Sequence, residues 1–417
     1  MLRQFIVDNQ QADVTQLALQ RKRYPMLSDS DFRFCLQQID GRQRTKDKLP
    51  SFAQIEGWQY PPRLNLEQCS SERTARFKAQ VLGEIRKQQS EILLIDGTGG
   101  YGVDTFFMSE QARETHYFEQ NTELAAIAEH NFRLAGRDIH CHAVPFDVSQ
   151  LESLLAQRSL LFQRSGLSAS AVLYLDPARR DNHGGKVFLL EDCTPNVIEI
   201  IRSIRLIREQ SIRVLLKLSP MLDFHQAVAQ LGGSWDIYVV SVNNEVKELL
   251  LLSEGTGKVY AVMLADEGEQ VLSFTPDEES GAEVHYLPMA NSQEPMAGMY
   301  IYEPNAALLK AGCFRLMSAR YDLLKAAQNT HLYFISQKQK VESQKQNLPG
   351  RWWQIVGVYA RVKDVQRVCT RANVLTRNYV MAADALRKQL RLKDGGDDYI
   401  IGCRIADKPV LLHCQRI

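Results

Sequence analysis

The sequence predicts an α/β protein of the Rossmann-like class, with a parallel sheet between helices, a helical region before it and small α+β domains after it. In residues 79–270, short apolar runs alternate with amphipathic segments, which is typical of strands and helices around a parallel sheet. Four of these runs lead to an acidic residue, at positions 96, 119, 147 and 176, in steps of 23, 28 and 29 residues. Such steps match the length of a strand–helix unit, so we expect the four carboxylates along one edge of the sheet.

The composition limits the class of protein. The 417 residues suffice for two to four domains, and 45% hydrophobic with 24% charged residues is ordinary for a soluble globular chain. No apolar run approaches the roughly 20 residues that cross a bilayer, and the amino terminus lacks a secretory signal. The eight cysteines are scattered without a C-x-x-C pair, which argues against a zinc site and a disulfide framework. We therefore expect a cytoplasmic protein with no metal and no membrane partner.

Changes in composition along the chain predict four regions. In order, they are a helical region, the sheet domain, a small α/β domain that begins with an acidic, turn-rich stretch, and a basic domain that begins with a lysine- and glutamine-rich linker. Their predicted bounds are 1–78, 79–270, 271–335 and 336–417.

The formal net charge of +1 hides an uneven distribution of charge. Residues 336–417 hold 16 Lys and Arg against 7 Asp and Glu, and residues 1–80 hold 13 against 9. The middle of the chain is therefore acidic. A basic end favours a polyanionic partner such as RNA, because neutralised phosphates release counterions. Basic residues dispersed over a solvated surface would give the same composition, so both interpretations stay open.

A glycine-rich turn, ILLIDGTGGYG, joins the first strand to the next helix and ends at Gly102. Glycines let the backbone approach a ligand closely, since they lack a Cβ and tolerate positive φ. Similar turns also bind dinucleotides or phosphates, or only reverse the chain. The later acids make the signal more specific. Glu119, 17 residues past Gly102, is placed to accept hydrogen bonds from both ribose hydroxyls, and Asp147 from an adenine amino group. An acid after a strand is often only a helix N-cap, but four in register indicate a cofactor site.

These residues resemble the first motif of class I S-adenosylmethionine-dependent methyltransferases, which have a seven-stranded sheet. The resemblance implies S-adenosylmethionine as cofactor, with Asp96 at its methionine end, directly or through water, and Glu119 on its ribose. Thr98 stands at the first of the family's three glycine positions. The implied cofactor-binding residues are Asp96, Gly97, Thr98, Gly99, Gly100, Gly102, Glu119, Asp147 and Asp176.

Nearly the whole chain also resembles bacterial methyltransferases that carry a carboxy-terminal THUMP-like domain. The matching segments are LNLEQCSSERTARFKA, DGTGGYGVDT, LDPARR, YIYEPNAALLKAG, RANVLTRNY and LRLKDGGDDYI. This resemblance implies a ferredoxin-like and a THUMP-like domain after the sheet domain. It also implies RNA, either tRNA or rRNA, as the partner, because THUMP domains belong to tRNA-modifying enzymes.

The fourth strand is followed by the turn DPARR, residues 176–180. It resembles the Asn/Asp-Pro-Pro-Tyr turn of amino-methylating nucleic-acid enzymes, in which the first two residues hold the acceptor amine. The resemblance implies that Asp176 is the catalytic residue and that Pro177 lies beside the substrate, but the stacking aromatic is absent. Arg179 and Arg180 could instead contact phosphate or stack on a base, or they could pair with nearby acids.

The next strand bears on the type of methyl transfer. Methylation of a pyrimidine at C5 needs a cysteine nucleophile there, but this chain has KLSP at residues 217–220. Nitrogen or ribose-oxygen methylation remains, and we expect transfer to a base nitrogen in structured RNA. A methyltransferase acting on a protein or small molecule, and an RNA-binding protein that keeps the pocket without turnover, stay open.

Three other features of the sequence give weaker indications of function. Core packing is favoured over base stacking for Trp352 and Trp353. The helix AADALRKQL has a basic outer face that is a candidate RNA surface or only a solvated face. His140 and His142 have no ligand partners in sequence, so we expect ordinary surface or hydrogen-bonded histidines.

Overall fold

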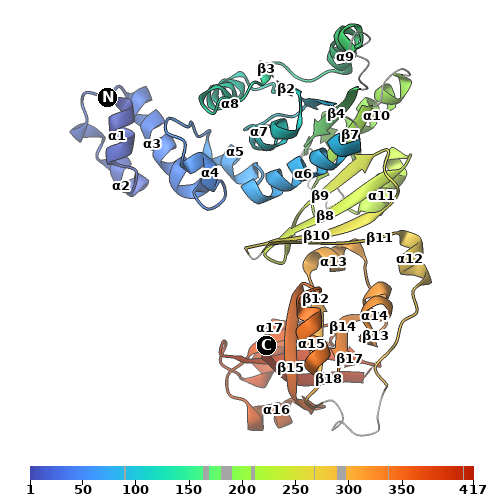
Figure 1. Cartoon of the computed structure of the whole chain (residues 1–417). Coiled ribbons are helices and arrows are strands. Elements are labelled where there is room, and N and C mark those ends of the chain that lie inside the picture. Colours follow the sequence, from blue (N-terminus) through green and yellow to red (C-terminus); the bar gives the residue numbers. More distant parts are fainter. Residues whose placement is uncertain are drawn as a thin grey trace. The chain divides into compact units, whose positions relative to one another are not determined.

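The computed structural model describes residues 1–88, 91–162, 169–179, 190–207, 212–266, 268–288, 297–336, 338–406 and 408–417. The chain forms two compact units, Met1–Trp235 with Leu249–Gly255 and Asp236–Glu248 with Thr256–Ile417. Figure 1 labels their helices and strands. Among the described residues, no helix is long and apolar enough to cross a membrane.

The first unit begins with a helical region. Its helices are α1 (Leu2–Asp8), α2 (Val14–Leu19), α3 (Asp29–Thr45), α4 (Pro50–Ala53), α5 (Arg63–Gln68) and α6 (Glu72–Gln88). Aromatic rings join this region to the helix that follows the glycine turn. Phe52 stacks on Trp58 with ring centroids 4.1 Å apart, and on Phe107 at 5.7 Å. The helical region therefore packs directly against the helix that follows the first motif.

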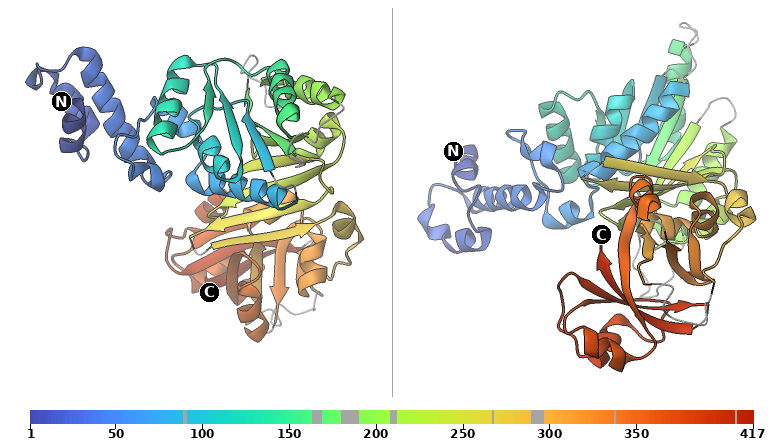
Figure 2. Two further views of the ribbon diagram at one scale, coloured as in Figure 1. Left: turned by 45° about the horizontal axis from the view of Figure 1, so that its top comes forward. Right: turned by 60° about the horizontal axis from the view of Figure 1, so that its bottom comes forward.

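A nine-stranded sheet follows, and its strands are drawn from light blue to yellow in the two views of Figure 2. The strand order is β11-β10-β8-β9-β7-β4-β1-β2-β3. Its strands are β1 (Glu91–Asp96), β2 (Glu114–Phe118), β3 (His140–His142), β4 (Ala169–Leu175), β7 (Ile212–Leu218), β8 (Trp235–Val242), β9 (Glu245–Ser253), β10 (Val259–Ala265) and β11 (Gly268–Phe274). The connecting helices are α7 (Val103–Met108), α8 (Thr122–Leu134), α9 (Val148–Phe162), α10 (Val197–Leu206) and α11 (Phe224–Leu231). A two-stranded sheet, β5 (Ala178–Arg179) with β6 (Cys193–Thr194), lies between β4 and α10 in the chain.

The predicted fold class is confirmed, but the sheet has nine strands where the sequence predicted seven. Strands β3, β2, β1, β4 and β7 are parallel, and β9 runs antiparallel to β7. The difference lies at the other end of the sheet. There β10 pairs in parallel with β8, and β11 continues as an antiparallel hairpin with β10.

A second sheet of seven strands, in the order β13-β14-β12-β15-β18-β17-β16, forms the rest of the chain. Its strands are β12 (Tyr300–Pro304), β13 (Leu324–Ala327), β14 (Thr330–Ile335), β15 (Gly350–Tyr359), β16 (Asn373–Arg377), β17 (Asp398–Ile405) and β18 (Lys408–Arg416). The helices here are α12 (Pro276–Gly281), α13 (Ala306–Ala311), α14 (Arg315–Tyr321), α15 (Lys338–Lys345), α16 (Val362–Val368) and α17 (Ala383–Leu390). The sheet takes strands from both sides of residue 336, where the sequence divided two domains.

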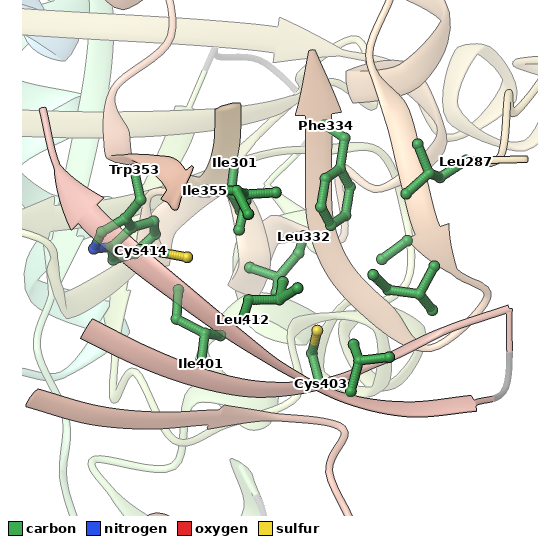
Figure 3. Close-up of a cluster of buried hydrophobic side chains, with 13 residues drawn as sticks. Leu287, Ile301, Leu332, Phe334, Trp353, Ile355, Ile401, Cys403, Leu412 and Cys414 are labelled. Carbon is green, nitrogen blue, oxygen red and sulfur yellow. The ribbon is translucent and has the colours of Figure 1, made fainter. Parts of the chain in front are cut away.

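One apolar core packs on this sheet, and residues from both sides of residue 336 contribute to it (Figure 3). Ile301 and Phe334 come from β12 and β14, and Trp353 and Leu412 come from β15 and β18; each of the four is at most 1% exposed. Both tryptophans for which the sequence favoured core packing over base stacking are buried, Trp352 at 4% and Trp353 at 1%. Core packing was therefore the correct interpretation.

Truncation of Trp353 tests how much this shared core contributes. Trp353→Ala should lower the free energy of unfolding by about 3–5 kcal/mol, because it deletes a large buried ring and leaves a cavity. Val356→Ala, on the same strand but 48% exposed, is the matched control. Urea unfolding followed by far-UV circular dichroism measures both variants. Equal midpoints would contradict a shared core at this position.

Candidate cofactor site

A cavity of about 420 Å³ lies where the carboxyl ends of β1, β2 and β4 meet in the first unit. This volume is within the range of small-molecule sites, about 300–1,000 Å³. The described residues that line it come from four segments of the first unit, namely 65–70, 96–104, 118–124 and 145–146, together with Tyr174, Asp176, Ala178, Thr194 and Pro195. The cavity therefore lies at the edge of the sheet that the spacing of the acids predicts.

The glycine turn has this shape because side chains of the neighbouring elements fill the space around it. Gly99 N–H donates to the carbonyl of Phe118 at 2.8 Å, and a Cβ on Gly99 would lie 2.1 Å from the ring of Tyr117. Gly102 has a φ of +80°, and its Cβ would lie 2.5 Å from the ring of Phe132. Glycine is therefore required at both positions, once for close approach and once also for its backbone angle.

Glu119 is hydrogen-bonded to the glycine turn. Its Oε2 accepts a hydrogen bond from Gly100 N–H at 2.8 Å, and its Oε1 accepts one from Asn121 N–H at 2.7 Å. Tyr117, two residues earlier, donates its hydroxyl to the carbonyl of Gly100 at 2.5 Å. These bonds hold the acid at the tip of β2 against the first motif, at the wall of the cavity.

Asp96 lies at the end of β1 and is only 1% exposed. Its Oδ1 accepts a hydrogen bond from Thr98 N–H at 2.9 Å, and its Oδ2 accepts one from the Thr105 hydroxyl at 2.5 Å. Burial raises the pKa of Asp96 from 3.8 to about 7, because the charged form loses its hydration, although the two hydrogen bonds oppose this shift. A cation in the cavity would favour the ionised form of this carboxyl group.

Asp176 follows β4 and is joined to the first motif by a side chain that replaces a glycine. The hydroxyl of Thr98 accepts a hydrogen bond from Asp176 N–H at 2.6 Å. The carboxylate of Asp176 is 38% exposed, and its Oδ2 accepts a hydrogen bond from Lys217 Nζ at 2.5 Å. The backbone of Asp176 is therefore held by the glycine turn, and its side chain is held by β7.

The remaining predicted residues lie less centrally. Asp147 is exposed, and its Oδ1 accepts a hydrogen bond from Ser149 N–H at 2.8 Å, as the side chain of a capping residue does. Its neighbour Phe146 lines the cavity, whereas Asp147 is not among the lining residues. Pro177 is partly exposed and follows Asp176 outside the cavity lining. The backbone of Arg179 belongs to β5. Arg180 lies outside the described residues.

Sequence reasoning missed the contribution of the helical region to the cavity. Asn65, Gln68, Cys69 and Ser70 line it, from the end of α5 and the turn before α6. Their segment, LNLEQC, carried part of the family resemblance, so a signal was present without an assigned role. Burial raises the pKa of the Cys69 thiol, and the thiol donates to the carbonyl of Leu66 at 3.2 Å. This cysteine is therefore not an activated nucleophile.

A buried ion pair fixes this segment to the sheet domain. Lys78 is 0% exposed, and its Nζ lies 3.1 Å from Asp104 Oδ1. The other oxygen of Asp104 accepts hydrogen bonds from the hydroxyls of Ser70 at 2.8 Å and Tyr174 at 2.7 Å. Burial alone would raise the pKa of Asp104, but Lys78, Lys217 and these hydroxyls lower it below its ordinary value. The carboxylate of Asp104 on α7 therefore binds side chains from both α6 and β4.

Comparison with known proteins agrees with this geometry. Residues 300–341 match a ferredoxin-like domain family and residues 350–416 match a THUMP domain-like family. Two uncharacterized S-adenosylmethionine-dependent methyltransferases of Mycobacterium tuberculosis, from strains CDC 1551 and H37Rv, are each 28% identical over 288 residues, which cover 65% of this chain and 71% of theirs. The crystal structure of a proposed methyltransferase from Porphyromonas gingivalis W83 is 26% identical, covers 100% of this chain and 97% of that one, and has a TM-score of 0.79.

Fold, motif and relatives define the class of protein. The family resemblance in the sequence is confirmed: the chain has homologues named S-adenosylmethionine-dependent methyltransferases, matches a proposed methyltransferase in structure over its full length, and ends in a THUMP-like domain. The relatives from Mycobacterium tuberculosis depend on S-adenosylmethionine. The cavity fits this molecule in volume, and the donor set fits it in chemistry, with a buried carboxyl group at one strand end and a glutamate at the next.

The buried Asp96 should make the stability of the cofactor-free protein depend on pH. Between about pH 4 and pH 7 the folded chain keeps a proton on Asp96 that the unfolded chain has lost. The stabilisation from the raised pKa is therefore lost as the pH rises through this window. Asp96→Asn, which cannot ionise, should lack this part of the slope. Thermal melting at pH 5 and pH 8 compares the two proteins, and identical slopes would rule out the raised pKa.

The bond between Thr98 and Asp176 is tested by removing a single hydroxyl group. Thr98→Val keeps the shape but leaves Asp176 N–H without its acceptor, at a cost of about 1–3 kcal/mol. We expect affinity for S-adenosylmethionine to fall by about tenfold, which corresponds to about 1.4 kcal/mol. Thr98→Ser, which keeps the hydroxyl, is the control and should bind nearly as well as the natural protein. Isothermal titration calorimetry measures both, and equal affinities would show that the hydroxyl has no role.

Proposed function

We propose that this enzyme transfers a methyl group from S-adenosylmethionine to a base nitrogen in structured RNA, either tRNA or rRNA. The observation that carries the proposal is Asp176, a partly exposed carboxylate at the cavity that Thr98 and Lys217 hold in a fixed position. The cofactor supplies an activated methyl group on a sulfonium. The chain then has to bind it, bring an acceptor into line and orient the acceptor lone pair.

The roles proposed for the cofactor end of the cavity follow from the contacts described above. Asp96 is proposed for the amino group at the methionine end, because a cation there would offset the burial of its carboxyl group. Glu119 is proposed for the ribose hydroxyls, since carboxylate oxygens accept more than one hydrogen bond. The backbone of the glycine turn, with Gly97, Gly99 and Gly100, would pass close beside the cofactor, and Phe146 would lie near its adenine.

At the acceptor end, Asp176 is proposed to accept a hydrogen bond from the acceptor amine, as the catalytic residue. Lys217 lies 2.5 Å from its Oδ2 and fixes the carboxylate orientation. The amine proton is then lost to water, because the carboxylate is already paired. Pro177, Arg179 and Arg180 are proposed as residues that meet the RNA.

The choice of RNA rests on the carboxy-terminal domain. Residues 350–416 are THUMP-like, and residues 336–417 hold 16 basic against 7 acidic residues. Some of these charges are neutralised within the protein, since Arg361 pairs with Asp364 and Arg387 pairs with Asp384. Lys388 and Arg391 on α17 and its end are exposed, whereas Leu386 of the same helix is buried. This basic face of α17 is proposed to contact phosphates.

The proposal is tested with the purified full chain, radiolabelled S-adenosylmethionine and total RNA from a strain that lacks the gene. We expect label in RNA, at least a hundredfold less with Asp176→Ala, and unchanged label with Asp277→Ala, an exposed carboxylate on α12. Nucleoside analysis would then identify the methylated atom.

Two other outcomes would contradict parts of the proposal. Cofactor binding without label in RNA would exclude RNA as acceptor and favour a protein or small molecule. Label that persists in Asp176→Ala would exclude Asp176 as the catalytic residue.

A further inference from the structure

Three histidines and a glutamate lie together on β2 and β3, and none of them is among the residues assigned to methyl transfer. Glu114 and His116 are two residues apart on β2, and His140 and His142 are two residues apart on β3. Alternate residues of a strand point to the same face of the sheet. The two strands pair in parallel with His116 opposite His140, so the four side chains share one face. Strand β3 is the last strand of the sheet, so this face is at its edge.

The side chains already contact one another. Nε2 of His116 lies 2.8 Å from Glu114 Oε1, and Nδ1 of His116 lies 3.0 Å from His142 Nε2. The rings of His116 and His140 are stacked with centroids 4.8 Å apart. One ligand atom from each of Glu114, His116 and His140 lies within 4.8 Å of the other two.

We propose that Glu114, His116 and His140 bind a divalent transition-metal ion of the zinc type. Two imidazoles and one carboxylate are a known ligand set for Zn²⁺, with a fourth position left for water. Small rotations of the side chains would open the bond between Glu114 and His116 and bring three donors to about 2.0–2.2 Å from the ion. His116 is 6% exposed and His140 is exposed, so the site has a fixed inner ligand and an open side for entry.

His142 acts as the positioning residue of the site. A metal-binding histidine uses its second ring nitrogen to bond a neighbouring group, which fixes the ring and its tautomer. The bond between His116 Nδ1 and His142 Nε2 has this arrangement. His142 in turn stacks on Phe118 with ring centroids 4.4 Å apart, and Phe118 lines the cofactor cavity. A bound ion would therefore hold β2 and β3 together beside the cofactor.

The test is a titration of the tag-free full chain with Zn²⁺, because an affinity tag made of histidines would itself bind the ion. We expect one equivalent of Zn²⁺ to bind by equilibrium dialysis and to raise the melting temperature, whereas Mg²⁺ does neither. His140→Ala and Glu114→Gln should lose this equivalent, since each removes a ligand. His142→Ala should keep the stoichiometry but bind about 10–100-fold more weakly, as loss of an orienting partner does.

Two controls assign the binding to this site. His225→Ala removes an exposed histidine on α11 and should bind Zn²⁺ as the natural protein does. A second group of possible donors, Cys369, Asp398 and His413, lies in the carboxy-terminal domain. Cys369→Ser must therefore leave the assigned equivalent in place. Unchanged binding in both His140→Ala and Glu114→Gln, or complete loss in Cys369→Ser, would overturn the proposal, and neither result depends on methyl transfer.

Discussion

The site depends on the parallel pairing of β1 with β2 on one side and β4 on the other. Asp96 pairs in register with Tyr117 and Tyr174, so the residues that follow these two strands lie beside the end of β1. Backbone bonds extend the pairing into the turn, where Gly97 N–H donates to the carbonyl of Tyr174 at 3.0 Å. Glu119 and Asp176 are thus placed by strand register before any side-chain contact is made. A slip of one residue would reverse which side chains face the cavity.

The same edge carries an unusual amount of buried charge. Asp96 and Asp104 are both buried, and Lys78 reaches Asp104 from the helical region with no exposed surface of its own. A buried pair of this kind adds little net stability, because desolvation of the charges offsets their attraction, but loss of one partner is costly. The pair therefore disfavours arrangements of the helical region that leave Asp104 without Lys78, and the Ser70 hydroxyl after α5 binds the same carboxylate.

The parts of the site that could be predicted from sequence are those set by local spacing. The glycine turn, Glu119 and Asp176 follow directly from strand ends, and all of them line the cavity. Asp147 differs because β3 has only three residues and ends at His142, so the acid comes five residues too late to lie at the strand tip. The 29 residues between Asp147 and Asp176 match the length of a strand–helix unit. The separation of Asp147 from the end of β3, however, does not match a residue at a strand tip.

Contacts between segments far apart in the chain could not be predicted from local spacing. Cys69 and Ser70 line the cavity beside the buried pair of Lys78 and Asp104, and no periodicity in the sequence reveals this contact. The grouping of the histidines of β2 and β3 could not be predicted for the same reason. Residues of each strand alternate in a way that the sequence shows, but the register that pairs the two strands appears only in the tertiary structure. Cysteine spacing, on which the expectation of no metal rested, carries no information about ligands contributed by two neighbouring strands.

The departure of Thr98 from the family's glycine illustrates how a local exception can follow from a tertiary contact. A glycine at this position would leave Asp176 N–H to find another acceptor at a partly buried strand end, which carries a free-energy cost. The threonine hydroxyl supplies that acceptor at 2.6 Å, while Thr98 N–H itself binds Asp96. One residue thus links the carboxyl group proposed for the cofactor to the one proposed for the acceptor. Strand register already brings these two carboxyl groups to the same edge of the sheet, and the threonine hydroxyl adds a hydrogen bond at that point while the turn is kept.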